Sequence, residues 1–254
     1  MTRWALGVEY VGTHYVGWQH QTGLRSIQGA LVEALSQVAD HPVELTCAGR
    51  TDAGVHASGQ VVHFDSDAAR SARAWVLGAN AHLERYISVA WAQAVPEHFH
   101  ARYSALRRHY RYQIFNRAVR SALEVERCTW VRETLDAERM HMAAQVLVGE
   151  HDFSAFRAAE CQSKTPVRRV ESVAVHREGE RIYLDICANA FLHHMVRNIA
   201  GLLISVGRGE RAATDVERIL AGRDRKQSAP TAAPEGLYLR AIDYPAAFGL
   251  PIRL

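Results

Sequence analysis

The segment "CAGRTDAGVHASGQVVHFD", residues 47–65, holds one carboxylate, Asp52, in a loop between two strand-like apolar runs. Arg50 lies close enough in sequence to keep that carboxylate ionised, and Gly49 and Gly54 permit positive φ or close approach to a ligand. An ionised carboxylate held in this way can act as a nucleophile or a general base at carbon. The simpler alternative is that Asp52 caps a turn, Arg50 is its surface partner and His56 is a solvated loop residue.

A second candidate segment is "RRHYRYQIFN", residues 107–116, whose alternation is typical of a strand. Tyr110 and Tyr112 fall on one face of this strand, and Arg107, His109 and Arg111 fall on the other. A tyrosine at a binding cleft could stack on a flat base while arginines contact phosphate. We expect Tyr112 to be a core residue and Tyr110, nearer the strand start, to lie at the cleft.

The third candidate segment, "NAFLHHMVRNIAGLLISVG" at residues 189–207, is predicted to be a helix with an apolar core stripe. On another face, Ala190, His193, Arg197 and Gly201 recur at helical spacing and make a small-residue strip with one cation. We expect another part of the structure or a ligand to approach closely there. Because neighbouring residues on a helix point about 100° apart, His193 and His194 do not predict a two-histidine metal site.

The elements that must position these residues follow one order twice. Strands are expected at 3–10, 43–48, 60–65 and 87–95, with helices at 26–39, capped by Ser26, and at 69–80. The second round begins with a strand at 107–115, a helix at 136–148 and a hairpin at 170–188 that turns at Gly179. It continues with the helix at 189–207, a short helix from a capping box at Thr214 to Gly222, and a strand at 236–244. Loops are expected at 116–135 and 223–236.

This order predicts an α+β fold with two ferredoxin-like, RRM-like halves, at 1–105 and 106–254. We expect the halves to join into one extended, mostly antiparallel sheet with helices and a central cleft. Such a frame serves RNA binding and many other functions, so the fold alone does not decide the function.

Charge, apolar runs and cysteine spacing narrow the classes of protein to which the chain can belong. The 254 residues carry a net charge of +3, and residues 106–254 hold 23 Lys and Arg against 18 Asp and Glu. A basic half favours an anionic polymer as partner. The chain has no apolar run of about 20 residues and no signal-peptide pattern. Its four scattered cysteines lack metal-ligand spacing, so we expect a reduced, cytoplasmic protein without metal or membrane span.

Together these segments resemble the tRNA pseudouridine synthase A family of bacteria. The resemblance rests on "GRTDAGVHASGQVVHF", "RRHYRYQI", "NAFLHHMVRNI" and "EGLYL", with "GVEYVGTHYVGWQHQ", "FHARYSA" and "FSAFRA" in the same order along almost the whole chain. It implies the pseudouridine synthase fold, a homodimer and no cofactor. It also implies, as substrate, the uridines at positions 38, 39 and 40 of the tRNA anticodon stem-loop.

The resemblance also implies roles for single residues. Asp52 falls on the catalytic nucleophile, Arg197 on its ion-pair partner, and Tyr110 on the tyrosine that contacts the target base. Arg50 is expected to support Asp52, and His56 and Leu237 to contact substrate. One departure is "NAHLERYI", where Glu84 and Tyr86 replace the usual turn residues.

Two other functions compete with this hypothesis. A non-catalytic RNA-binding protein on ferredoxin-like domains would use Asp52 only as a turn residue, but its strands should carry more aromatics than Tyr110, Tyr112 and Phe115. A metal-dependent hydrolase would need clustered ligands, whereas the fourteen histidines are dispersed along the chain.

Overall fold

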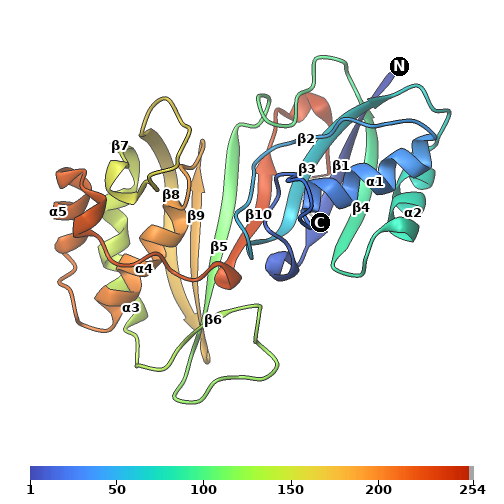
Figure 1. The fold of residues 1–254 in the computed structure, drawn as a ribbon. Helices are drawn as coiled ribbons and strands as arrows, with labels where there is room; N and C mark the ends of the chain where they lie inside the picture. Colours follow the sequence, from blue (N-terminus) through green and yellow to red (C-terminus); the bar gives the residue numbers. More distant parts are fainter. Residues whose placement is uncertain (252–254) are drawn as a thin grey trace. The chain divides into compact units, whose positions relative to one another are not determined.

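The computed structural model describes residues 1–251, which divide into two compact units. One unit comprises residues 1–108 together with the segment from Tyr238 onward, and the other comprises His109–Leu237. Among the described residues, no helix is long and apolar enough to cross a membrane. Figure 1 labels the helices and strands of both units.

The sheet of the first unit is built around a long central strand. This strand, β3 (His56–Ser66), pairs antiparallel with β1 (Thr2–Tyr10), and β1 pairs antiparallel with β4 (Ile87–Val95). The short β2 (Thr46–Cys47) also pairs with β3. The expected strand–helix–strand order of this half is confirmed, although β2 is shorter than the predicted 43–48.

Two helices complete the first unit. Helix α1 (Ile27–Ala39) begins at the predicted N-cap, because the Ser26 hydroxyl accepts a hydrogen bond from the Gly29 N–H. Helix α2 (Ala72–His82) packs on α1 and on β4 (Figure 1). Its Trp75 is fully buried and lies edge-on against Phe64 of β3, with a ring-centroid distance of 4.9 Å. Large aromatic rings therefore fill the space between helix and sheet.

The C-terminal strand β10 (Leu237–Asp243) differs from the expected division of the chain. It pairs in parallel with β3, with Tyr238 opposite His56 and Leu239 opposite Ala57. The expected boundary at 105 and 106 lies near the observed one, but the residues from Tyr238 fold with the first unit and not with the second. Backbone pairing between distant segments decides this membership, and local sequence pattern does not encode it.

The second unit contains a sheet of β5 (Arg107–Asn116), β9 (Arg181–Ala188), β8 (Val167–Glu178) and β7 (Gly149–Asp152) in that order. The predicted hairpin is confirmed as β8 and β9, with Gly179 at φ +58° in its turn. A short strand, β6 (Thr129–Val131), pairs in parallel with β5 inside the segment that was expected to be a loop.

Three helices belong to the second unit: α3 (Ala137–Ala144), α4 (Met195–Gly207) and α5 (Asp215–Gly222). Helix α3 packs on β8 and on α4. The predicted capping box at Thr214 is wrong, because Thr214 is already in helical conformation and its side chain caps nothing. Instead, the Asp215 carboxylate accepts a hydrogen bond from the Ala212 N–H at 3.1 Å.

Candidate active site

Asp52 lies on the loop between β2 and β3 and is half-buried. The Val55 N–H donates to the Asp52 carbonyl at 3.2 Å, which closes a four-residue turn. Gly54 takes φ +79° at the third position of that turn, as a type II turn requires. The expectation that Gly54 permits an unusual backbone here is confirmed.

The backbone of this loop is anchored by residues far away in sequence. The Thr51 carbonyl accepts a hydrogen bond from the Trp18 N–H at 2.9 Å, and the Thr51 hydroxyl bonds to that of Tyr10 at 2.8 Å. Gly17, at φ +102°, passes so close that a Cβ there would lie 2.8 Å from the Thr51 carbonyl oxygen. The sequence analysis did not identify Thr51 as a supporting residue. The signal was the segment "GVEYVGTHYVGWQHQ", which contains Tyr10, Gly17 and Trp18 and is one of the segments that resemble the family.

His56, expected to contact substrate, is only 1% exposed. Its Nδ1 accepts a hydrogen bond from the Gly12 N–H at 3.0 Å, and its ring stacks on Tyr238 at 4.6 Å. An Nδ1 that accepts in this way leaves the proton of the neutral ring on Nε2. His56 therefore joins the Asp52 loop to β10 and to the segment after β1, and it is not the solvated loop residue of the simpler alternative.

Arg50 is exposed at the start of the same loop. Burial raises the pKa of the Cys47 thiol to about 12. The positive charges of Arg50 and Arg102 oppose this rise, because they stabilise the thiolate. Two arginines therefore lie near the base of the Asp52 loop.

The two tyrosines of strand β5, Tyr112 and Tyr110, differ in their burial. Tyr112 is fully buried, and its hydroxyl donates to the Ala233 carbonyl at 2.8 Å, which confirms it as a core residue. Burial is also the main cause that raises its pKa. Tyr110 is 9% exposed and meets the Phe191 ring edge-on at 4.9 Å.

On the opposite face of β5, at least one arginine is engaged in an ion pair within the protein. Arg111 forms a two-pronged ion pair with Asp185 of β9, with distances of 2.7 and 2.8 Å, and lies over the Tyr183 ring. The hydrogen bonds to Asp185 raise the pKa of Arg111. The idea that this arginine contacts phosphate is therefore not supported by its placement.

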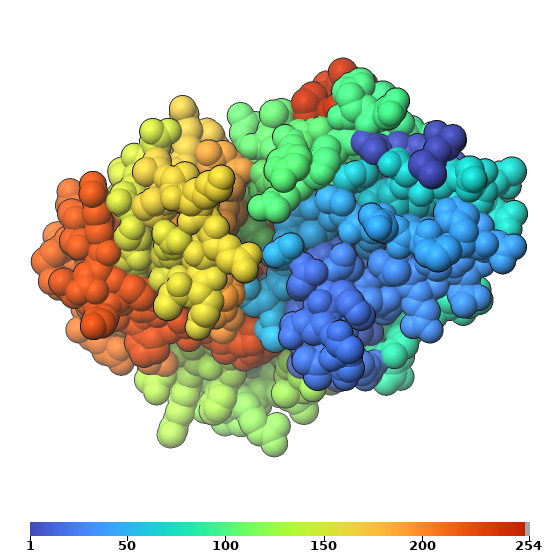
Figure 2. Space-filling model, turned by 45° about the horizontal axis from the view of Figure 1, so that its top comes forward, coloured from blue at the N-terminus to red at the C-terminus, as the bar shows by residue number. Residues whose placement is uncertain are grey.

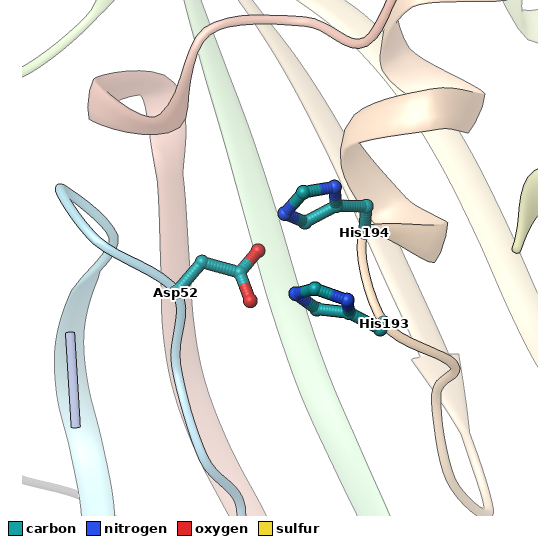
Figure 3. A group of neighbouring side chains, drawn as sticks. All are labelled: Asp52, His193 and His194. Atoms are coloured by element: carbon teal, nitrogen blue, oxygen red, sulfur yellow. The ribbon is translucent and has the colours of Figure 1, made fainter. Parts of the chain in front are cut away.

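His193 and His194 lie outside the helix in which we expected them. Helix α4 begins at Met195, and His194 has φ +60°, a left-handed conformation that a right-handed helix does not contain. Their rings lie 4.0 Å apart, not on divergent helical directions. Figure 3 shows both imidazoles on the segment that leads into α4 and Asp52 on its loop. The angular argument against a two-histidine site was therefore wrong.

Arg197 and Gly201 do lie on α4, and the expected close approach at this strip is confirmed for them. A Cβ on Gly201 would lie 2.1 Å from the Pro230 carbonyl oxygen, so the segment around Pro230 crosses the helix there. The Arg197 Nε donates to the Ala232 carbonyl at 2.9 Å, and the Ala232 N–H donates to the Arg197 carbonyl at 3.1 Å. Together these bonds fix the direction of the half-buried guanidinium.

A buried polar network beside Arg197 was missed by our sequence reasoning. Asn198 is fully buried and donates to the Phe156 carbonyl at 2.7 Å. Its Oδ1 accepts from Arg225 at 3.0 Å and from the Thr231 hydroxyl at 2.7 Å. Burial lowers the pKa of Arg225. The network ties the segment that crosses α4 to the rest of the second unit, and an asparagine inside an apolar helix was the signal that could have revealed it.

The remaining expected contact residue, Leu237, is buried and begins β10 directly after a short helical turn at Pro234–Gly236. The atypical turn at 84–86 is also defined by contacts. Glu84 pairs with Arg25, the Tyr86 ring lies 4.2 Å from that of His14, and the Val11 N–H donates to the Tyr86 carbonyl. This turn therefore packs against the segment that carries the anchors of the Asp52 loop.

Comparison with known proteins defines the class. A family described as tRNA pseudouridine synthase matches residues 7–104 and 143–245. The tRNA pseudouridine synthase A of Methylococcus capsulatus is 55% identical over 248 residues, which are 98% of this chain and 92% of that protein. The protein of the same name from Pseudomonas aeruginosa is 54% identical over 254 residues, all of this chain and 89% of that protein.

The class is thus that of the pseudouridine synthases, which are isomerases. Within it, the chain belongs to the tRNA pseudouridine synthase family. This confirms the resemblance, and the mixed α+β fold with mostly antiparallel strands agrees with the fold it implied. The alternatives of a non-catalytic RNA-binding protein and a metal-dependent hydrolase are not favoured.

Proposed function

We propose that this enzyme converts uridine to pseudouridine at positions 38, 39 and 40 of the tRNA anticodon stem-loop, with Asp52 as the catalytic group. The observation that carries the proposal is the loop itself. A half-buried carboxylate sits in a turn whose neighbours are fixed by Trp18, Tyr10 and Gly17. Such fixation holds a reactive group in position without reorganisation during the reaction.

The reaction exchanges one bond of the sugar for another. The bond from N1 of the base to C1′ breaks, the base turns, and C5 joins C1′. The hydrogen on C5 leaves as a proton, and N1 gains one, so no atom is added and no electron is transferred to an outside acceptor. The proposal therefore requires no cofactor. Asp52 begins cleavage, either as a nucleophile at the sugar or as a base.

The other residues have supporting roles in the proposal. Arg197, which belongs to the second unit, is proposed as the ion-pair partner of Asp52, and Arg50 as a supporting cation. The target base must leave its stack, which costs a few kcal/mol, and a contact with Tyr110 would offset part of this cost. Leu237 is proposed to contribute apolar surface, and His56 to act through the shape of the loop that it supports.

The decisive experiment replaces Asp52 by Asn and by Ala and follows tritium release from tRNA labelled at C5 of uridine. Because the proposed nucleophile is absent, turnover should fall by a factor on the order of 1,000 or more, while tRNA binding persists. Asp67→Asn, which removes an exposed carboxylate of the same unit, should retain activity. Substantial turnover by either Asp52 variant would refute the assignment.

Two further parts of the proposal concern the cell and the assembly. We propose that the enzyme works in the cytoplasm, where tRNA is processed, and that it forms a homodimer. Light scattering should then give a mass twice that of the 28.4 kDa chain. A monomeric mass at working concentration would remove the dimer from the proposal.

A further inference from the structure

A rigid turn in the first unit follows strand β4 and spans residues 99–104. Phe99 and Ala101 are fully buried and anchor it from below. Its backbone is held from several sides: the Ala101 N–H donates to His63, and the Ala101 carbonyl accepts from the Tyr244 hydroxyl at 2.6 Å. Within the turn, the His100 Nδ1 accepts from the N–H groups of Arg102 and Tyr103. The turn is therefore pre-organised.

This turn presents an aromatic ring to solvent. Tyr103 is 77% exposed. The His100 ring lies 4.3 Å from its ring, at an angle of 32°, and the Arg102 guanidinium lies 5.7 Å from its centre. A single exposed apolar residue needs no explanation, but a ring supported on one side and paired with a cation is a stacking surface of low conformational entropy.

Arg102 is the cation that the turn itself exposes. Between Glu97 and Glu124 the sequence contains six arginines and no acidic residue, although Arg107 and Arg111 pair with Asp243 and Asp185 from other strands. Arg102 is exposed within this run, and its side chain forms no ion pair with a carboxylate of the described residues. Figure 2 shows the segment near residue 100, in green, at the surface of the first unit. Aromatic residues interleaved with arginine are the pattern by which proteins hold single-stranded nucleic acid.

The turn is also connected to the Asp52 loop within the first unit. Arg108 donates to the Arg102 carbonyl at 2.8 Å and to the Ala48 carbonyl at 3.2 Å. Ala48 stands four residues before Asp52. The charges of Arg50 and Arg102 both lower the pKa of the Cys47 thiol at the base of the loop, against the larger effect of burial. One arginine side chain thus bridges the exposed turn and the segment that carries the candidate catalytic group.

We infer that Tyr103 and Arg102 form an additional RNA contact, in which the Tyr103 ring stacks on an unpaired nucleobase of the bound tRNA and Arg102 contacts an adjacent phosphate. This inference rests on the proposed function for its RNA partner. It assigns binding to the turn and chemistry to Asp52, so the two can fail separately.

The test measures tRNA binding in the Asp52→Asn background, where turnover does not deplete the substrate. Tyr103→Ala should weaken binding about tenfold, because the stacking surface for the base is lost, and Tyr103→Phe should bind within about twofold of the parent. Arg102→Ala should lower the slope of log affinity against log salt by about 1. Leu77→Ala and Arg73→Ala, exposed positions on α2, are the matched controls and should change nothing.

Turnover with Asp52 intact separates this contact from catalysis. Tyr103→Ala should raise KM for tRNA and leave kcat at saturating tRNA unchanged, with an unaltered melting temperature because the side chain is exposed. Binding by Tyr103→Ala equal to the parent would overturn the inference. So would equal weakening by Phe and Ala, because the hydroxyl and not the ring would then be responsible. Full turnover by Asp52 variants with weak binding by Tyr103→Ala would overturn the proposed function alone.

Discussion

At the scale of single residues, His63 is a buried side chain that helps to fix the geometry of an exposed turn. Its Nδ1 accepts a hydrogen bond from the Ala101 N–H at 3.2 Å, inside the turn that presents Tyr103. Burial lowers the pKa of His63 to about 4, and the charges of His100 and Arg3 act in the same direction. The folded protein therefore holds this ring neutral, as the hydrogen bond requires.

This shifted pKa makes a prediction about acid stability. A histidine whose pKa is lower in the folded state stabilises the fold above its unfolded pKa of about 6.5, and that contribution is lost as the pH falls toward 4. Between pH 7 and pH 4.5, the loss from His63 is on the order of 2 kcal/mol of unfolding free energy.

Urea denaturation at the two pH values measures this loss. The control is His63→Asn, whose Oδ1 can accept the Ala101 N–H but does not titrate. This variant should lose less stability on acidification, and the titrating groups that do not interact with His63 cancel in the comparison. Equal acid sensitivity in both proteins would show that His63 does not carry the effect.

At the scale of elements, the position of Arg197 depends on the segment that crosses α4. The Pro230 carbonyl lies against Gly201, and Ala232 bonds reciprocally with Arg197. The Asn198, Arg225 and Thr231 network holds this segment down. The direction of the Arg197 side chain on α4 therefore depends on the segment 230–232 staying packed against the helix.

Gly201→Ala tests this dependence. In an ordinary helix the change to alanine stabilises by up to about 1 kcal/mol. At Gly201 the new methyl would meet the Pro230 carbonyl, so we expect lower stability and lower kcat, with little change in tRNA affinity.

The matched control is Gly222→Ala at the end of α5, where the nearest atom to a new Cβ lies 3.9 Å away. This variant should be as active as the parent and at least as stable. Full stability and activity of Gly201→Ala would show that the segment can move without affecting Arg197.

At the scale of the whole molecule, charge distribution predicts how RNA binding responds to salt. Only two of the 30 basic side chains, Lys164 and Lys226, are lysines, and arginine suits forked contacts to phosphate. Each phosphate contact releases counterions, so tRNA affinity should fall at least about tenfold between roughly 50 and 200 mM salt. Filter binding in the Asp52→Asn variant measures this slope. An affinity independent of salt would contradict a phosphate-based mode of binding.

The sequence by itself determined the features that local chemistry fixes. Alternation placed Tyr112 in the core, glycine chemistry marked the turn at Gly54, and Ser26 marked the start of α1. The order of motifs was specific enough to indicate the family. These predictions succeeded because each depends on side chains only a few residues apart.

Only the tertiary structure decided the rest. It moved His193 and His194 out of helix α4, joined β10 to β3 of the first unit, and surrounded Asn198 with partners from Phe156, Arg225 and Thr231. The physical reason is the same in each case. Backbone pairing and buried hydrogen bonds between distant segments outweigh local helix or strand preference, and a sequence pattern does not state which segments will meet.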